Sequence, residues 1–211
     1  YLRKDLSIED VKIVYQAWEP GKLVTYPTDA NHIEDLSLGD GLRLDAIFSP
    51  ESVAVVGASS TPGKVGHDIF ENILKGGFKG TLYPVNPKAR SVLSVRCYKS
   101  MMDIPDPIDL AMIILPPRIA LKTVDDCIEK GVKGIVIVSA GFKEVGAEGA
   151  RIEDEIADKC RKAGIRLIGP NCLGVINPSD NVRLNASFSA RMPQKGNISF
   201  ISQSGALCTA V

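Results

Sequence analysis

Residues 53–66 read Val53-Ala54-Val55-Val56-Gly57-Ala58-Ser59-Ser60-Thr61-Pro62-Gly63-Lys64-Val65-Gly66, and they carry the strongest structural signal in the chain. An apolar, β-branched run breaks into a turn of small residues and then opens a helix. This order is typical of a buried parallel strand whose following turn lets an anion approach the backbone. The helix presents free N–H groups and the positive end of its dipole to that turn. The stretch therefore predicts a phosphate-binding turn for a nucleotide-like ligand.

Further apolar runs follow at the spacing of repeated βαβ units. We expect strands at Ser52–Val56, Thr81–Val85, Leu110–Leu115, Gly134–Val138 and Arg166–Ile168. Amphipathic segments long enough for crossover helices lie at His67–Leu74, Ala120–Glu129 and Ala150–Arg161. The strands lack polar alternation, which indicates that both of their faces are covered. The predicted fold is α/β, with a Rossmann-like doubly wound parallel sheet.

Right-handed crossovers bring the carboxyl ends of all these strands to one edge of the sheet, where ligands bind at the switch point. The candidate binding residues are therefore those just past each strand. They are Gly57–Gly66, Asn86–Arg90, Pro116–Arg118, Ser139–Glu144 and Gly169–Gly174.

Residues 1–43 differ in character from the rest and are predicted to form an N-terminal helical arm and a linker. Ser7 caps the expected helix, and Pro20-Gly21 ends it. Its apolar face consists of Ile8, Val11, Tyr15 and Trp18. The stretch Thr25–Asp40 is polar and aperiodic, which favours a linker.

A sixth apolar run, Asn197–Ile201, follows a break at Pro193–Gly196 and leads into another expected helix. One strand and the start of a helix cannot bury a core. We therefore expect a domain of residues 44–195, the start of a truncated second domain at 196–211, and a chain that is part of a longer protein.

The composition indicates a globular chain without a strong overall charge. Of 211 residues 45% are hydrophobic, and 25 Lys and Arg balance 25 Asp and Glu, so no global field attracts nucleic acid or an anionic membrane. The 5 cysteines are widely spaced and form no C-x-x-C pair, which indicates reduced thiols and no metal site. No apolar run approaches a membrane span or a secretory signal, so we expect a cytoplasmic protein.

The glycines at 57, 63 and 66 do not fit the G-x-G-x-x-G pattern of a dinucleotide site. The second strand is followed by Lys88 and Arg90, where an NAD site would place a carboxylate. Two cations there favour a phosphorylated ribose, which both coenzyme A (CoA) and NADP carry. Alternatively, they are solvated loop cations.

Several motifs in the same order resemble the CoA-binding portion of NDP-forming acyl-CoA synthetases, the superfamily of ADP-forming acetyl-CoA synthetase and the succinyl-CoA ligase α-subunit. The resemblance covers about residues 44–211. Its motifs are Phe48–Ser59, Gly77–Lys88, Ser139–Glu144, Gly169–Gly174 and Ser202–Gly205. The last of these resembles the opening of a second, flavodoxin-like domain.

The resemblance implies roles for residues at the sheet edge. Ser59, Ser60, Thr61, Pro62 and Gly63 would hold the CoA phosphates, and Lys88 would contact the nucleotide end. Pro116, Ser139, Ala140 and Gly141 would line the adenine and pantetheine path. Asn171 and Cys172 would lie close to the CoA thiol. The plain alternative is that these residues only end strands and cap helices. Cys172 has no His or Asp nearby in sequence, so we do not interpret it as a nucleophile.

The resemblance also implies a reaction that interconverts acyl-CoA, NDP and phosphate with a carboxylic acid, CoA and NTP. The phosphorylated histidine of that reaction is expected beyond Val211, so this part alone would bind CoA without turnover. His32 lies in the linker, and His67 is interpreted as a partly exposed helix residue rather than an anion ligand.

The expected partners are CoA, a small carboxylic acid and a nucleotide-grasp domain or subunit in an oligomer. ADP or GDP with Mg would bind to the full-length enzyme. Two alternatives stay open. One is the regulatory, ligase-like region of a protein lysine acetyltransferase, and the other is a CoA- or NADP-binding module without chemistry.

Overall fold

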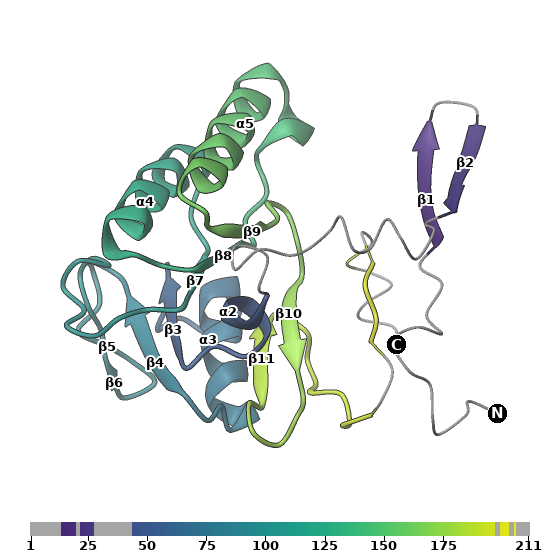
Figure 1. Ribbon diagram of the computed structural model, residues 1–211. Coiled ribbons are helices and arrows are strands. Elements are labelled where there is room, and N and C mark those ends of the chain that lie inside the picture. Colours follow the sequence, from purple (N-terminus) through teal and green to yellow (C-terminus); the bar gives the residue numbers. More distant parts are fainter. Residues whose placement is uncertain (1–13, 20–21, 28–43, 197–198, 203–204, 206–211) are drawn as a thin grey trace. The chain divides into compact units, whose positions relative to one another are not determined.

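The computed structural model describes residues 14–19, 22–27, 44–196, 199–202 and 205 (Figure 1). The chain forms two compact units, residues 1–43 and 44–211.

The larger unit is built on a five-stranded sheet in the order β4-β3-β7-β8-β9, and all neighbouring strands are parallel. The strands are β3 (Ser52–Val56), β4 (Thr81–Val85), β7 (Leu110–Ile113), β8 (Gly134–Ile137) and β9 (Arg166–Ile168). Counted along the chain, this order is 2-1-3-4-5, a doubly wound order whose switch point lies between the first and third strands. The predicted parallel α/β sheet is therefore confirmed, and each expected strand begins at the residue predicted.

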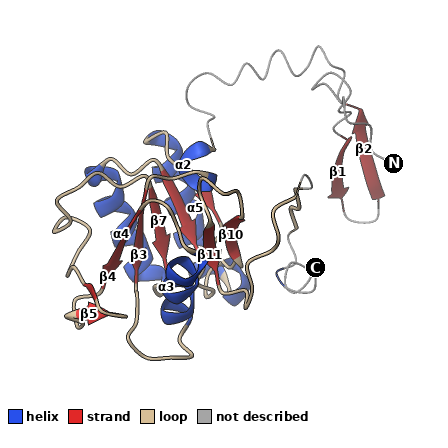
Figure 2. Ribbon diagram, turned by 90° about the horizontal axis from the view of Figure 1, so that it is seen from below, coloured by secondary structure: helices blue, strands red, loops and turns tan. Residues whose placement is uncertain are grey.

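Helices and a hairpin cover the two faces of this sheet (Figures 1 and 2). One face packs against α4 (Pro117–Lys130) and α5 (Ala147–Lys162). The other packs against α2 (Asp45–Phe48), α3 (Val65–Gly76) and the antiparallel pair β10 (Gly174–Asn177) and β11 (Leu184–Ser187). Two smaller strands, β5 (Ser91–Val92) and β6 (Val95–Arg96), and the 3-10 helix η3 (Lys143–Val145) lie in the connections.

Pleating divides the core between the two faces. Along β3, Ala54 and Val56 pack with α4 and α5, whereas Val53 and Val55 pack with α3 and the β10–β11 pair. All four side chains are buried because each face is covered. This burial explains why the strand reads as a continuous apolar run without polar alternation.

The three crossover helices extend beyond the amphipathic segments that located them. Pro117 occupies the first turn of α4, where its missing N–H costs nothing. Gly77 and Gly131 end α3 and α4 in the left-handed conformation, with φ of 75° at each.

The β10–β11 pair was not expected from the sequence. Asn185 and Ser187 are polar but buried, and the Ser187 hydroxyl donates to Asn185 Oδ1 at 2.7 Å. Asn72 on α3 donates to the Ser187 and Ser189 carbonyls at 2.8 and 2.9 Å. These bonds satisfy polar groups that sequence patterning treats as exposed.

The smaller unit corrects the predicted N-terminal helix. Residues Val14–Glu19 form strand β1 and Lys22–Pro27 form strand β2, paired antiparallel with Val14 opposite Pro27. Tyr15 and Trp18 therefore lie in a strand, and Thr25–Pro27 do not belong to a linker. β-Branched and aromatic residues favour strands, and Pro20-Gly21 stands between two such runs. The rest of the expected helix and linker, residues 1–13 and 28–43, lies outside the described residues.

The sixth expected strand is not formed over Ser199–Ile201, which has no regular secondary structure. None of the described strands pairs with these residues, and a strand needs a neighbour for its backbone groups. Asn197 and most of the expected helix lie outside the described residues. The domain boundary at residue 196 stays a prediction.

Candidate functional site

Gly57 lies at the switch point, between the ends of β3 and β7. Its N–H donates to the Val85 carbonyl at 2.9 Å, and Ile114 N–H donates to the Val56 carbonyl at 2.8 Å. Gly57 has φ of 95°, and a Cβ atom there would lie 2.3 Å from the Ile114 carbonyl oxygen. Glycine is therefore required for the chain to turn at this point.

The turn that follows β3 is open to solvent at its tip. Ser60, Thr61, Pro62 and Gly63 are exposed, and Ser59 is half-buried. The Thr61 N–H donates to Ser59 Oγ at 3.1 Å, so this N–H already has an acceptor. Pro62 has no N–H and can supply only shape. The groups of the turn that remain available to an anion are the hydroxyls and the other N–H groups.

His67, in the first turn of α3, is buried at 5% exposure, which corrects the prediction that it is partly exposed. Its Nδ1 lies 3.0 Å from the Ser59 carbonyl oxygen. A carbonyl oxygen only accepts hydrogen bonds, so Nδ1 carries the proton. Its Nε2 lies 4.0 Å from a Glu71 carboxylate oxygen. His67 thus anchors the backbone of the turn.

Asn86 directly follows β4 and joins two of the candidate loops, a role that sequence reasoning missed. Its Nδ2 donates to the Ala58 carbonyl at 2.8 Å. Its Oδ1 accepts from the Lys88 N–H at 2.9 Å. Asparagine often bonds a backbone N–H two residues ahead, which signals the second contact but not the first.

Lys88 and Arg90 are both exposed. Within residues 44–196, neither side chain has an ion-pair partner. Their positive charge is not compensated by a neighbouring carboxylate, and Asn86 fixes the backbone of Lys88 beside the turn after β3.

A pocket of about 390 Å³ lies where α4 and α5 begin, beside the ends of β7 and β8. Pro116 and Gly141 line it, together with Pro117, Arg118, Val145, Gly146, Ala147, Glu148, Gly149 and Ile152. The pocket joins two of the predicted binding segments and does not include Ser59–Gly63 or Lys88.

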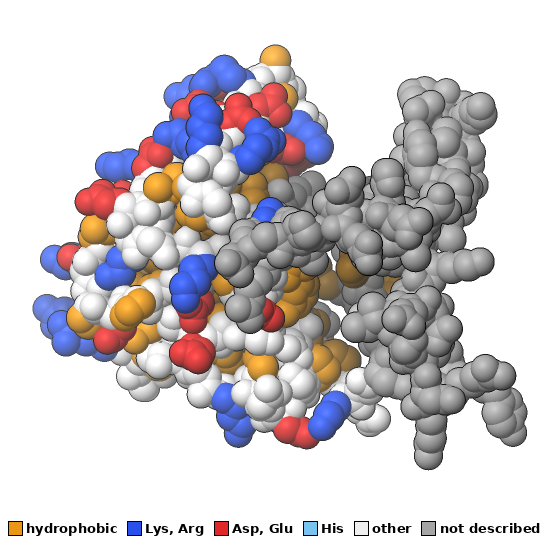
Figure 3. Space-filling model, in the orientation of Figure 1, with side chains coloured by type: hydrophobic (Ala, Val, Ile, Leu, Met, Phe, Trp, Pro, Cys, Tyr) orange, Lys and Arg blue, Asp and Glu red, His pale blue; other side chains and the backbone are white. Residues whose placement is uncertain are grey.

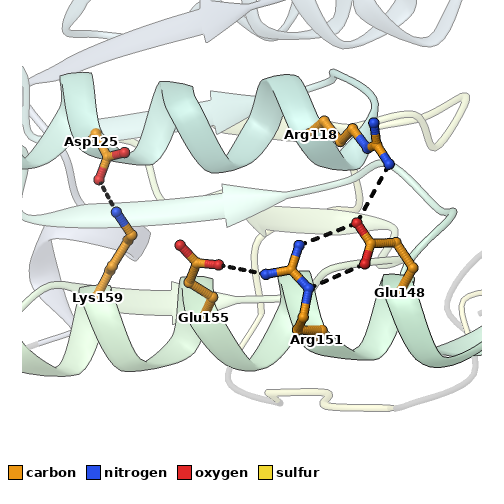
Figure 4. Close-up of polar contacts among 6 residues, drawn as sticks. All are labelled: Arg118, Asp125, Glu148, Arg151, Glu155 and Lys159. Carbon is orange, nitrogen blue, oxygen red and sulfur yellow. Dashed lines mark hydrogen bonds and ion pairs between the residues drawn. The ribbon is translucent and has the colours of Figure 1, made fainter.

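Charged side chains connect α4 to α5 beside this pocket (Figure 4). Arg118 lies 3.6 Å from Glu148, which also pairs with Arg151. Lys159 and Asp125 pair further along the two helices. Lys and Arg alternate with Asp and Glu over this part of the surface (Figure 3). The network joins the two helices through pairs of opposite charge.

Ser139, Ala140 and Gly141 follow β8, and Gly141 has φ of 103°. The Gly141 N–H donates to Glu144 Oε1 at 2.5 Å, so it is not free for a ligand. The carboxylate accepts this bond, which holds the pKa of Glu144 below its usual value. Ser139 is half-buried and Ala140 is exposed.

Asn171 and Cys172 follow β9. The Asn171 N–H donates to the Ser139 carbonyl at 2.9 Å, which ties this loop to the one after β8. The Cys172 Sγ donates to the Ile137 carbonyl at 3.3 Å. Burial raises the pKa of the Cys172 thiol, which disfavours the nucleophilic thiolate.

The predicted binding residues form two groups at the carboxyl edge of the sheet, and contacts join the residues within each group. Asn86 joins Lys88 to the turn after β3. The Asn171 backbone joins its loop to Ser139, and the pocket joins Gly141 to Pro116.

Among the described residues, no group of His, Cys, Asp and Glu is arranged to hold a metal ion. No described helix has the length and apolar character to cross a membrane.

Comparison with known proteins gives matches to this unit. Residues 51–178 match the CoA binding domain family. The chain is 47% identical over 168 residues to acetate–CoA ligase (ADP-forming) I of Archaeoglobus fulgidus, covering 80% of this chain and 24% of the relative. It is 48% identical over 164 residues to the alpha subunit of acetate–CoA ligase (ADP-forming) II of Pyrococcus furiosus, covering 78% of this chain and 35% of the relative.

The fold of this unit is also similar to that of a solved structure. The dinucleotide-forming acetyl-coenzyme A synthetase 1 of Candidatus Korarchaeum cryptofilum, in complex with phosphate and ADP, superimposes with a TM-score of 0.74 at 43% identity. The superposition covers 80% of this chain and 35% of that one. The chain spans about a quarter to a third of the length of these relatives. With a family match over residues 51–178 and a fold shared with this structure, the chain belongs to the CoA binding domain family.

Proposed function

We propose that the chain binds CoA along the carboxyl edge of its sheet and is the CoA-binding part of an NDP-forming acyl-CoA ligase. One observation carries this proposal. An exposed, hydroxyl-rich turn at the switch point is joined through Asn86 to a lysine whose charge is not compensated. Such a pairing suits a ligand with two separate phosphate groups, because charge-assisted hydrogen bonds to phosphate are strong.

Each part of CoA has a matching segment under this proposal. Ser59–Gly63 face the diphosphate, and Lys88, with Arg90 beside it, faces the 3′-phosphate of the ribose. Pro116 and Ser139–Gly141 line the path of adenine and pantetheine, supported by the pocket that reaches both segments. Asn171 and Cys172 lie toward the thiol end.

The whole protein would join CoA to a small carboxylic acid at the expense of NTP, or run in reverse. The names of the ligases that match this chain support this activity. A nucleotide-grasp domain or subunit, Mg and a phosphorylated histidine would be supplied outside the described residues, within an oligomer. The free thiols of Cys97, Cys127, Cys160 and Cys172 fit a reducing, cytoplasmic environment.

Titration calorimetry with CoA, 3′-dephospho-CoA and NADP tests the proposal. We expect CoA to bind about tenfold or more tightly than 3′-dephospho-CoA, because one charged hydrogen-bonded contact contributes roughly 1.5–3 kcal/mol. Lys88→Ala should weaken CoA binding by that factor and leave 3′-dephospho-CoA binding unchanged.

Lys122→Ala is the matched control, since Lys122 is an exposed lysine on α4 outside the site. Its CoA binding should equal that of the wild type. A preference for NADP would contradict the proposed ligand. Equal binding of CoA and its dephosphorylated form would contradict the role of Lys88.

A further inference from the structure

Two successive carbonyl groups of the turn after β3 are held by side chains from elsewhere in the fold. Ala58 O accepts from Asn86 Nδ2 at 2.8 Å, and Ser59 O accepts from His67 Nδ1 at 3.0 Å. Asn86 comes from the end of β4 and His67 from α3. The turn is therefore fastened on two sides, at neighbouring peptide units.

Fixing these carbonyls also fixes the N–H groups of the same peptide units. In a planar trans peptide the C=O and N–H bonds point in opposite directions. The Ala58 carbonyl shares its peptide with the Ser59 N–H, and the Ser59 carbonyl shares its peptide with the Ser60 N–H. Both N–H groups are therefore turned away from the side chains that hold the carbonyls.

Neither of these N–H groups has an acceptor among the described residues. Ser59 is half-buried and Ser60 is exposed. Successive free N–H groups in a turn form a concave site for an anion.

We propose that His67 and Asn86 are positioning residues that aim the Ser59 and Ser60 N–H groups at the diphosphate of CoA. The inference rests on the proposed function. His67 acts through its Nδ1 proton on the Ser59 carbonyl, and in this role it does not contact the ligand. Asn86 has a second role, because its Oδ1 also accepts a hydrogen bond from the Lys88 backbone N–H. One side chain thus connects the backbone of the diphosphate turn to the backbone of Lys88.

Two substitutions at His67 separate positioning from packing. His67→Leu removes the donor and keeps the apolar bulk, whereas in His67→Asn the amide nitrogen takes the place of Nδ1 and still donates. We expect His67→Leu to weaken binding of both CoA and 3′-dephospho-CoA about tenfold, the loss of one hydrogen bond to a charged group. His67→Asn should restore most of that affinity.

Asn72→Leu is the matched control for lost hydrogen bonds on α3. Asn72 also donates from α3 to backbone carbonyls, but to Ser187 and Ser189 at the β10–β11 pair. The Asn72→Leu substitution should lower the melting temperature of the protein and leave its affinity for CoA unchanged.

Amide NMR supplies the readout that packing alone would not change. In the wild type and in His67→Asn, CoA should shift the Ser59 and Ser60 amide protons downfield, as expected for N–H groups that bond phosphate. In His67→Leu these shifts should be lost. Equal affinity of His67→Leu and wild type, or equal loss in His67→Leu and His67→Asn, would overturn this inference. A wild type that does not bind CoA would instead overturn the proposed function.

Discussion

Gly66 shows how a single missing side chain shapes the candidate site. It is buried at the start of α3, and a Cβ atom there would lie 2.1 Å from the Gly57 carbonyl oxygen. The helix can approach the switch point this closely because Gly66 has no side chain. The contact brings the first turn of α3, including His67, against the loop that it anchors.

Gly66→Ala should therefore push α3 away from Gly57 and destabilise the protein by roughly 1–3 kcal/mol, the range for overpacked sites. CoA binding should weaken as well, because His67 moves with the helix. Urea unfolding and calorimetry would measure the two effects. Gly131→Ala is the comparison, since nothing lies within 4 Å of a Cβ there and its φ of 75° costs backbone strain alone. Unchanged CoA binding in Gly66→Ala would contradict this account.

Asp109 joins the amino ends of three strands, β3, β7 and β8. Its carboxylate accepts from the Glu51 N–H at 2.9 Å and from Lys133 Nζ at 2.7 Å. Partial burial alone would raise the pKa of Asp109, but the bonds from Lys133 and Glu51 outweigh it and hold that pKa below its usual value. A carboxyl with a lowered pKa stabilises the fold above its unfolded pKa of about 3.9, and this stability is lost as the pH falls through the folded pKa.

Asp109→Asn should thus lower the melting temperature at pH 7, and the difference from the wild type should shrink as the pH falls below about 4. Asp154→Asn, at an exposed position on α5 without an ion pair among the described residues, is the control. A melting temperature at pH 7 equal to that of the wild type would contradict this role. CoA binding should not change, because Asp109 lies at the edge opposite the site.

The sequence predicted the parallel sheet well because β3, β7 and β8 are buried on both faces, and such strands read as uninterrupted apolar runs. It missed the β10–β11 pair because Asn185 and Ser187 are polar but buried, and their burial depends on α3, whose Asn72 bonds the Ser187 carbonyl from 115 positions away in the chain. It placed the candidate loops at one edge of the sheet, but it did not predict the hydrogen bonds that join them. The contact from Asn86 to Ala58 joins residues 28 positions apart and leaves no local pattern. At residues 14–19, helical spacing of apolar residues competed with strand propensity, and the strand formed.

We propose that the carboxyl edge of the sheet holds the phosphates of CoA at the loops after β3 and β4, with adenine and pantetheine running past β7 and β8 toward β9. The chain carries 25 Lys and Arg and 25 Asp and Glu, so the proposal assigns the phosphates to local groups and not to a general positive field.

A crystal structure of the protein with CoA bound is the most direct test. We predict that the diphosphate accepts hydrogen bonds from the Ser59 and Ser60 N–H groups, and that the 3′-phosphate lies within contact of Lys88. Adenosine bound at the opposite edge of the sheet, or a diphosphate away from the turn after β3, would contradict the claim.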